Sequence, residues 1–301
     1  MTGAFRAACV QFTAARDYEP NIMAVSDLVR RARDDGADFV LTPENTGLIE
    51  PVGSLRREKA RDEANHPVLA ALREVARETG AWLLIGSLAV DISNEPGIPE
   101  GERRLANRSY LVNSDGEVTA HYDKIYMFDV DLAGGESYRE SNAFRPGGEV
   151  VLAETPWGAL GMTVCYDLRF PQLYRTLAQA GAEFLAIPSA FTVPTGKAHW
   201  HVLLRARAIE NGCFVFAPAQ WGEHAEGRHT YGHSLIVDPW GEVLADAGQG
   251  VEIIIGRIEV ARIAEARRMV PSLGHDQPFA RQNRVARPLA AEQRAAADCL
   301  G

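Results

Sequence analysis

The stretch Gly161-Met-Thr-Val-Cys165-Tyr-Asp-Leu-Arg-Phe-Pro171 is typical of a strand that ends in a sharp turn before a helix. The apolar run 160–164 predicts the strand, and the amphipathic run 172–180 predicts the helix. Cys165 therefore stands at the carboxyl end of a strand, where open α/β sheets bind their ligands. Backbone N–H groups and the positive end of the helix dipole favour a thiolate there and can hold an oxyanion. Because a free cysteine is also often a small buried hydrophobic residue, position alone leaves a functional and a structural interpretation open.

The same alternation of strands and helices extends from this stretch through both halves of the chain. Apolar periodicity and turn residues predict strands at 5–12, 38–41, 82–90, 109–112, 118–122, 150–153, 184–187, 213–217, 234–237, 243–245 and 253–258. The same criteria predict further helices at 21–33, 68–79, 197–211 and 260–268. The turn Asn113-Ser-Asp-Gly-Glu-Val118 has a counterpart in Asp238-Pro-Trp-Gly-Glu-Val243, so the two halves follow one plan.

This pattern indicates one domain with a quasi-twofold plan. A sheet with helices on one face has to bury its other face, and a second sheet serves that purpose. We therefore predict an α/β fold, a four-layer αββα sandwich of two mixed β-sheets. Residues 1–275 are expected to form this domain. Residues 276–301 are expected to be a C-terminal tail that contacts another subunit or is flexible.

The composition is that of an ordinary globular protein, with 46% hydrophobic and 24% charged residues in a chain of 301. A net charge of -9 without a basic tract argues against a nucleic-acid partner. No apolar run approaches the length of a membrane span and the N-terminus lacks the shape of a signal peptide, so we expect no membrane partner. Four scattered cysteines form neither a disulfide framework nor a zinc pattern. These features favour a cytoplasmic protein without a metal site.

Three reactive side chains follow predicted strands: Glu44, Lys124 and Cys165. Taken alone, Glu44 is typical of a capping or surface acid and Lys124 of a solvated lysine. Their context favours chemistry, because Glu44 closes a buried strand and the aromatic residues of 121–128 would partly desolvate Lys124. A carboxylate can take the proton of a thiol, and an ammonium can stabilise both the thiolate and an oxyanion. The three residues thus form a consistent set for acyl transfer.

The sequence resembles the nitrilase superfamily of carbon–nitrogen hydrolases over nearly its whole length, from Ala7-Ala-Cys-Val-Gln11 to about Val270. The matching motifs are Leu41-Thr-Pro-Glu44-Asn45, His121-Tyr-Asp-Lys124-Ile125 and Val164-Cys165-Tyr-Asp-Leu-Arg-Phe170. The resemblance implies the αββα sandwich and a Glu-Lys-Cys triad. In that triad, Glu44 would be the general base, Lys124 the transition-state stabiliser and Cys165 the nucleophile. A second glutamate of the family matches Glu140, which would position the lysine or the attacking water.

Motifs further along the chain resemble one branch of this superfamily. They are Pro188-Ser-Ala-Phe-Thr-Val-Pro-Thr-Gly-Lys-Ala-His-Trp200, Leu204-Arg-Ala-Arg-Ala-Ile-Glu-Asn211, Ala219-Gln-Trp-Gly222 and Tyr231-Gly-His-Ser234. The branch contains deaminated glutathione amidase and the neighbouring ω-amidases, and the Ser-Ala-Phe-Thr and Ala-Gln-Trp versions favour the former. The resemblance implies hydrolysis of the terminal amide of a small α-keto acid through a thioester, with release of ammonia and without a cofactor. It also implies a homodimer or a higher homo-oligomer.

A substrate that carries a carboxylate requires a cationic anchor. Arg169, just beyond the nucleophile, is the favoured anchor, and Arg205 and Arg207 are alternatives. All three could equally be partners in structural ion pairs, for which Glu210 is one candidate. The predicted substrate-binding residues are Tyr166, Arg169, Phe191 and Thr195.

Other functions stay open at this point. Within the superfamily they are ω-amidase acting on α-ketoglutaramate, N-carbamoyl hydrolase, aliphatic amidase and nitrilase. A Cys-His thiol hydrolase would use His199 or His233 as its base. A binding protein that keeps the fold without catalysis is the non-enzymatic alternative, and the intact Glu-Lys-Cys set argues against it. Asp167 is expected to fix the turn that presents Cys165.

Overall fold

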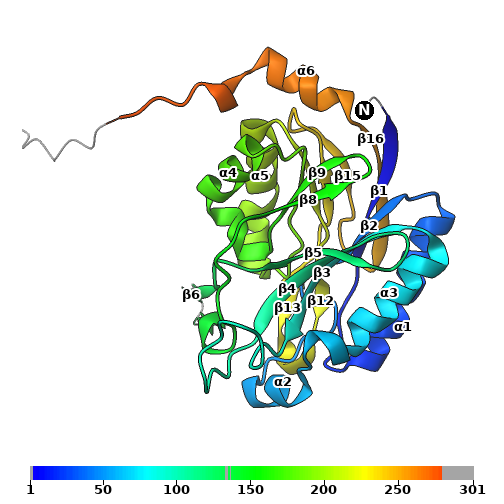
Figure 1. The fold of residues 1–301 in the computed structure, drawn as a ribbon, viewed down its shortest axis with the longest axis vertical. Helices are drawn as coiled ribbons and strands as arrows, with labels where there is room; N and C mark the ends of the chain where they lie inside the picture. Colours follow the sequence, from blue (N-terminus) through cyan, green and yellow to red (C-terminus); the bar gives the residue numbers. More distant parts are fainter. Residues whose placement is uncertain (1–2, 133–134, 136, 280–301) are drawn as a thin grey trace, which may run out of the picture.

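The structure is a computed structural model in which residues 3–132, 135 and 137–279 are described. Two six-stranded mixed sheets lie face to face with helices on their outer faces (Figure 1). The predicted four-layer αββα sandwich is therefore confirmed. Of the predicted C-terminal tail, residues 280–301 lie outside the described residues, so the division of the chain at residue 275 stays a prediction.

The first sheet has the strand order β16-β1-β2-β3-β4-β5. Its strands are β16 (Glu252–Glu259), β1 (Ala4–Gln11), β2 (Phe39–Leu41), β3 (Trp82–Val90), β4 (Ala106–Val112) and β5 (Val118–Asp123). The central strands β1, β2 and β3 run parallel to one another, and each outer pairing is antiparallel.

The second sheet has the order β15-β14-β11-β10-β9-β8. Its strands are β15 (Val243–Asp246), β14 (Leu235–Val237), β11 (Phe214–Ala217), β10 (Phe184–Ala186), β9 (Gly158–Met162) and β8 (Val151–Thr155). Here too three central strands, β11, β10 and β9, are parallel and the outer pairings are antiparallel. This shared pattern gives the fold the quasi-twofold plan expected from the repeated turns.

Two helices cover the outer face of each sheet. The helices α1 (Tyr18–Asp34) and α3 (Pro67–Thr79) cover the first sheet, whereas α4 (Pro171–Gln179) and α5 (Val193–Asn211) cover the second (Figure 1). The remaining elements are α2 (Gly53–Lys59), α6 (Ala261–Met269), the short hairpins β6–β7 (Asp129–Asp131, Ser137–Arg139) and β12–β13 (Trp221–Glu223, His229–Tyr231), and the 3-10 helices η1 (Glu63–Asn65), η2 (Glu140–Asn142), η3 (Cys165–Arg169), η4 (Ala225–Gly227) and η5 (Ser272–Gly274).

The main core lies between the two sheets and is rich in aromatic rings. Phe5 and Phe39 of the first sheet are buried against Phe184 and Phe216 of the second. The ring centroids of Phe5 and Phe184 are 5.4 Å apart in an edge-to-face arrangement, and those of Phe39 and Phe216 are 6.2 Å apart. Such pairs add directional attraction to the burial of apolar area. The packing therefore fixes the positions of the strand ends of one sheet relative to those of the other.

Three helices differ from the prediction by three residues or more, the first being α1, which begins at Tyr18 and not at 21. Helix α5 begins at Val193 and not at 197, because Pro194 is tolerated in the first turn of a helix. Helix α2 lies in a charge-rich segment where no helix was predicted. None of the residues of α2 is buried, so the segment carries no apolar periodicity from which to predict it.

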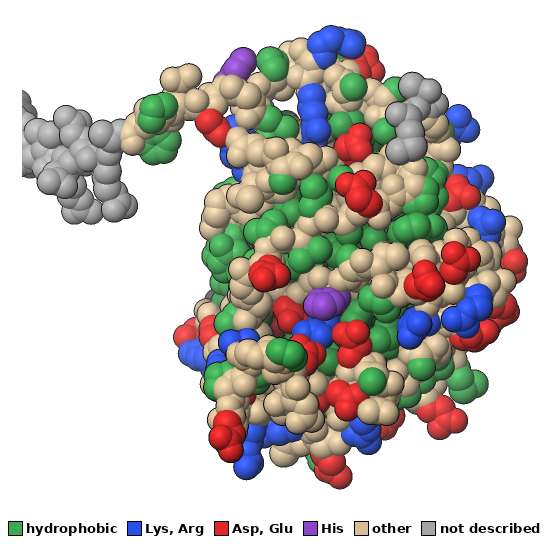
Figure 2. Space-filling model, in the orientation of Figure 1, with side chains coloured by type: hydrophobic (Ala, Val, Ile, Leu, Met, Phe, Trp, Pro, Cys, Tyr) green, Lys and Arg blue, Asp and Glu red, His purple; other side chains and the backbone are tan. Residues whose placement is uncertain are grey.

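Surface charge is mixed on the face shown in Figure 2, where Lys and Arg side chains are interspersed with Asp and Glu side chains. No helix among the described residues has the length and apolar character needed to cross a membrane.

Candidate active site

The three side chains of the predicted triad come from both sheets. Glu44 follows β2 and Lys124 follows β5 in the first sheet, whereas Cys165 follows β9 in the second. All three line one cavity of about 670 Å³. The face-to-face packing of the sheets thus brings together residues that lie up to about 120 positions apart in the sequence, and Glu44, Lys124 and Cys165 meet as the sequence predicts.

The turn at Cys165 holds the nucleophile candidate in an uncommon backbone conformation. Its φ is 51°, in the left-handed region that non-glycine residues rarely adopt, at a cost of roughly 1–3 kcal/mol. The buried carboxylate of Asp167 braces the turn. It accepts hydrogen bonds from the Tyr122 hydroxyl at 2.7 Å, the Val164 N–H at 2.8 Å and the Tyr126 N–H at 2.9 Å. Asp167 therefore ties η3 to the segment around Lys124.

We expect Asp167→Asn to lower both stability and turnover. The acid accepts hydrogen bonds on both oxygens, so an amide NH₂ on either side would face at least one backbone N–H donor. Two buried N–H donors that face each other without an acceptor lower the free energy of unfolding by about 1–3 kcal/mol. Thermal unfolding and kcat measure the effect, and Tyr122→Phe is the matched control because it removes a single hydrogen bond to the same oxygen. Equal effects of the two substitutions would contradict this account.

Lys124 is held between two carboxylates. Its ammonium lies 2.8 Å from Glu44 Oε1 and 3.0 and 2.9 Å from the two oxygens of Glu140. Only 1% of the side chain of Lys124 is exposed, and 4% of that of Glu44. Glu140 is fixed in turn by the Phe128 N–H at 2.6 Å. Glu140 therefore lies beside Lys124, as the sequence predicts.

Asn107 joins the two carboxylates to each other and was not predicted as a site residue. Its amide donates to Glu44 Oε1 at 2.9 Å and to Glu140 Oε1 at 3.1 Å. The other oxygen of Glu44 accepts the Ala190 N–H at 2.9 Å. The signal that could have revealed Asn107 is a polar residue on a strand, β4, whose residues are all buried.

The electrostatics of the group favour an ionised pair beside a neutral thiol. Burial alone would raise the pKa of Glu44, but Lys124 outweighs it and holds that pKa below its ordinary value. Burial would lower the pKa of Lys124, yet the charges of Glu140 and Glu44 raise it well above the usual range. For Cys165, burial and then the charge of Glu44 raise the thiol pKa despite Lys124. In the free protein the proton therefore rests on sulfur and the carboxylate is ready to accept it.

The predicted substrate-binding residues divide into two groups. Tyr166, Phe191 and Thr195 line the cavity that contains Cys165. Arg169 does not line it: its guanidinium lies over the rings of Tyr166 and Phe191 at 5.8 and 5.3 Å and reaches His199. The alternative anchors are engaged elsewhere, since Arg205 donates to the Gly241 carbonyl and Arg207 pairs with Glu210 and bonds the Leu168 carbonyl.

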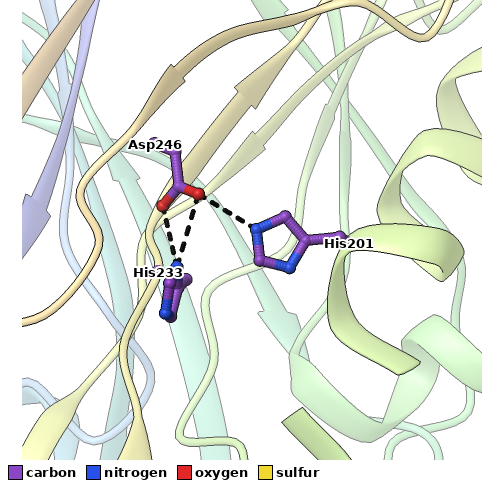
Figure 3. A group of neighbouring side chains, drawn as sticks. All are labelled: His201, His233 and Asp246. Atoms are coloured by element: carbon purple, nitrogen blue, oxygen red, sulfur yellow. Dashed lines mark hydrogen bonds and ion pairs between the residues drawn. The ribbon is translucent and has the colours of Figure 1, made fainter. Parts of the chain in front are cut away.

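Histidines proposed for a Cys-His pair lie away from the cavity. Of the histidines in the described part of the chain, His229 alone lines it, and neither His199 nor His233 does. His233 and His201 instead converge on Asp246 (Figure 3), at 3.0 Å each. The geometry accordingly offers Cys165 a carboxylate and an ammonium as neighbours, and no imidazole from His199 or His233.

Comparison with known proteins agrees with this geometry. The family model for carbon–nitrogen hydrolases matches residues 6–268. The deaminated glutathione amidase of Yersinia enterocolitica is 38% identical over 271 residues, which cover 90% of this chain and 92% of that protein. The structure of the C. elegans NitFhit protein has a TM-score of 0.83 and 35% sequence identity. It covers 92% of this chain, and this chain covers 66% of its length, just under two thirds.

A third similar protein is an amidase from Nesterenkonia sp. AN1, solved as a glutamate-to-glutamine variant after Michael addition of acrylamide at its active site cysteine. Its TM-score is 0.72 at 27% sequence identity, with 89% of this chain and 98% of that chain covered. The family match spans most of the chain, and the relatives named amidases match it nearly from end to end. The chain belongs to the carbon–nitrogen hydrolase family, in the nitrilase superfamily, and is an amidase-type enzyme.

Proposed function

We propose that this enzyme hydrolyses the amide of a small carboxylate-bearing α-keto acid, with deaminated glutathione as the best candidate, through a Cys165 thioester. The observation that carries the proposal is the convergence of Glu44, Lys124 and Cys165 on one cavity. The amidase from Nesterenkonia sp. supports the choice of nucleophile, because its active site cysteine is the residue that acrylamide modifies.

In the first half of the reaction, Glu44 takes the proton of Cys165 as the sulfur attacks the amide carbon. Because the thiol pKa is raised and the carboxylate pKa is lowered, this transfer is uphill in the free enzyme and accompanies the attack. Lys124 and the backbone N–H of Tyr166 stabilise the developing oxyanion. The C–N bond then breaks, and Glu44 delivers its proton to the leaving nitrogen.

In the second half, Glu44 takes a proton from a water molecule that attacks the thioester. The C–S bond breaks, the acid is released and Cys165 regains its proton. Glu140 and Asn107 hold Lys124 and Glu44 in position through these steps by hydrogen bonds.

The leaving group depends on the substrate. An unsubstituted amide such as α-ketoglutaramate releases ammonia, whereas deaminated glutathione carries the dipeptide Cys-Gly on its amide nitrogen and releases that amine. Both leave the same acyl group on sulfur. A cavity of about 670 Å³ has room for the larger of the two, and relatives named deaminated glutathione amidase support it.

We expect kcat/KM for deaminated glutathione to exceed that for α-ketoglutaramate by ~10-fold or more, because the dipeptide adds contacts within the cavity. Formation of α-ketoglutarate, the acid common to both, measures the two rates on one scale. The opposite ratio would identify an ω-amidase. Turnover of carbamoyl compounds or nitriles in preference to both would contradict the proposal.

A further inference from the structure

Four arginines that the sequence interpretation did not select line the cavity of Cys165, and of these Arg57 and Arg139 are exposed whereas Arg56 and Arg228 are not. Arg56 lies on α2, and Arg228 lies between η4 and β13. Both side chains are partly buried. They belong to segments about 170 residues apart, so their meeting at one cavity results from the tertiary fold.

Neither guanidinium has a carboxylate oxygen within 4.0 Å among the described residues. Arg56 donates to the carbonyls of Glu50 at 2.8 Å and Pro51 at 3.5 Å. Arg228 donates to the Ala190 carbonyl at 3.4 Å, and its buried Nε has no hydrogen-bond partner. By contrast, Arg139 at the same cavity pairs with Asp131. A partly buried cation without a counter-charge loses hydration that nothing replaces, which points to an anionic ligand for the two guanidiniums.

The two positive charges also repel each other. Burial lowers the pKa of Arg56, and the charge of Arg228 lowers it further, although Glu140 and Glu50 act in the opposite direction. Those acids are already committed, Glu140 to Lys124 and Glu50 to Arg16 and Lys59. An anion between the guanidiniums would relieve the repulsion.

Short chains of contacts connect Arg56 and Arg228 to the two acids beside Lys124. Arg228 donates to the carbonyl of Ala190, whose N–H donates to Glu44 Oε2. Arg56 lies over the ring of Phe144 at 5.3 Å, and the Phe144 N–H donates to the Glu140 carbonyl. Arg56 is therefore braced against the segment that carries Glu140, and Arg228 is braced against a residue that hydrogen-bonds Glu44.

We propose that Arg56 and Arg228 form an anion subsite that binds a carboxylate of the substrate and so selects carboxylate-bearing amides. This inference rests on the proposed function. Guanidinium groups suit the role because their fixed planar donors match the two oxygens of a carboxylate. The carboxylate can belong to the α-keto acyl group or to the C-terminal glycine of the leaving dipeptide, and the chemistry of recognition is the same.

Two matched substrate pairs test the subsite and distinguish its sources. α-Ketoglutaramate and 4-oxopentanamide differ only by a carboxylate in place of a methyl group on the acyl side. Deaminated glutathione and its C-terminal glycinamide differ only by the charge of the leaving group. We expect Arg56→Met and Arg228→Met each to lower the charged-to-neutral ratio of kcat/KM by ~30- to 1000-fold in at least one pair. The pair that responds identifies the bound carboxylate.

Arg103→Met is the control for net charge, because Arg103 is exposed and lies outside the cavity. The charged-to-neutral ratio of kcat/KM in this variant should stay within about twofold of the wild-type ratio. Arg56→Lys should recover part of the charged-to-neutral ratio of kcat/KM, since lysine has the positive charge but lacks the paired N–H donors of a guanidinium. Binding of α-ketoglutarate, followed as a rise in melting temperature, should weaken in the two methionine variants. Their own melting temperatures should not fall, because each substitution removes a repulsive charge.

The outcomes separate this inference from the proposed function. If the wild-type enzyme prefers the charged member of a pair and the two arginine variants keep that preference, the subsite is refuted and the function stands. If the wild-type enzyme prefers the neutral amides in both pairs, the proposed function fails and the subsite falls with it. A melting temperature lowered in both variants together with an unchanged ratio would assign the arginines a structural role and overturn the inference.

Discussion

Replacing Cys165 by Ala is expected to reduce kcat by ~10⁴-fold or more while the protein stays folded. Without the sulfur no thioester can form, and Glu44 has no thiol to deprotonate. The substitution keeps the β-carbon, so the strain of the turn at φ 51° is unchanged, and the loss of one buried atom costs about 1 kcal/mol. Steady-state kinetics on α-ketoglutaramate and thermal unfolding measure the two effects.

The matched control is Cys213→Ala. Cys213 is also a free, buried cysteine, but it lies just before β11 and outside the cavity. Its replacement should leave kcat within about twofold. Acrylamide should modify Cys165 in the wild-type protein and in the Cys213→Ala variant, and the adduct at position 165 should be missing from Cys165→Ala, which peptide mapping by mass spectrometry measures. Full amidase activity of Cys165→Ala would exclude the proposed mechanism.

Replacing Lys124 by Met is expected to cost both activity and about 3–5 kcal/mol of stability at pH 8. The substitution leaves the buried carboxylate of Glu44 and the partly buried carboxylate of Glu140 without their shared cation. It also removes the ammonium from the oxyanion, which lowers kcat by about 10²–10³-fold. Denaturant unfolding and steady-state kinetics measure the two effects separately.

The stability deficit of Lys124→Met should depend on pH in a defined direction. In wild type, Lys124 holds the folded-state pKa of Glu44 below its unfolded value, so this contribution is present above the unfolded pKa and is lost as pH falls through the folded pKa. In the variant, the two acids raise each other's folded pKa. Their penalty is therefore absent below the unfolded pKa of about 4.3 and grows as pH rises through the raised values.

Two further variants show whether the uncompensated charge is the cause. Adding Glu44→Gln to Lys124→Met removes one of the two carboxylates and should recover part of the stability without recovering activity. Arg139→Met removes a cation from the same cavity, but one whose pair with Asp131 is exposed, and should cost no more than about 1 kcal/mol. A deficit that is the same at pH 5 and pH 8 would contradict the electrostatic explanation.

The strand ends could be predicted from the sequence because hydrophobic runs mark where buried strands stop. Glu44, Lys124 and Cys165 each follow such a run, and the resemblance of three motifs in order assigned them to one site. Their distances could not be predicted, since they depend on how the two sheets pack. Asn107 was missed for a different reason: its strand was predicted to begin at 109, whereas β4 begins at Ala106, so Asn107 fell in the predicted loop.

Arg56 and Arg228 carry no local signal at all. Arg56 lies on a helix without a buried residue, and Arg228 lies in a short connection between polar residues. Arginine in such segments is ordinarily a solvated surface residue. Only the fold, which brings them to the cavity that Arg169 does not line, distinguishes them from Arg169, the anchor that adjacency to Cys165 favoured.

The origin of the triad in two different sheets has a consequence during synthesis. The ribosome releases Glu44 and Lys124 well before Cys165, and the strands that order the second sheet continue to residue 246. Until that sheet packs on the first, the thiol has neither its base nor its ammonium, and it is an ordinary cysteine. The nascent chain therefore lacks the neighbours of the thiol until the two sheets pack on each other, and the first sheet is itself completed only by β16 (Glu252–Glu259). A chain truncated before residue 246 should accordingly be chemically inert as well as incompletely folded.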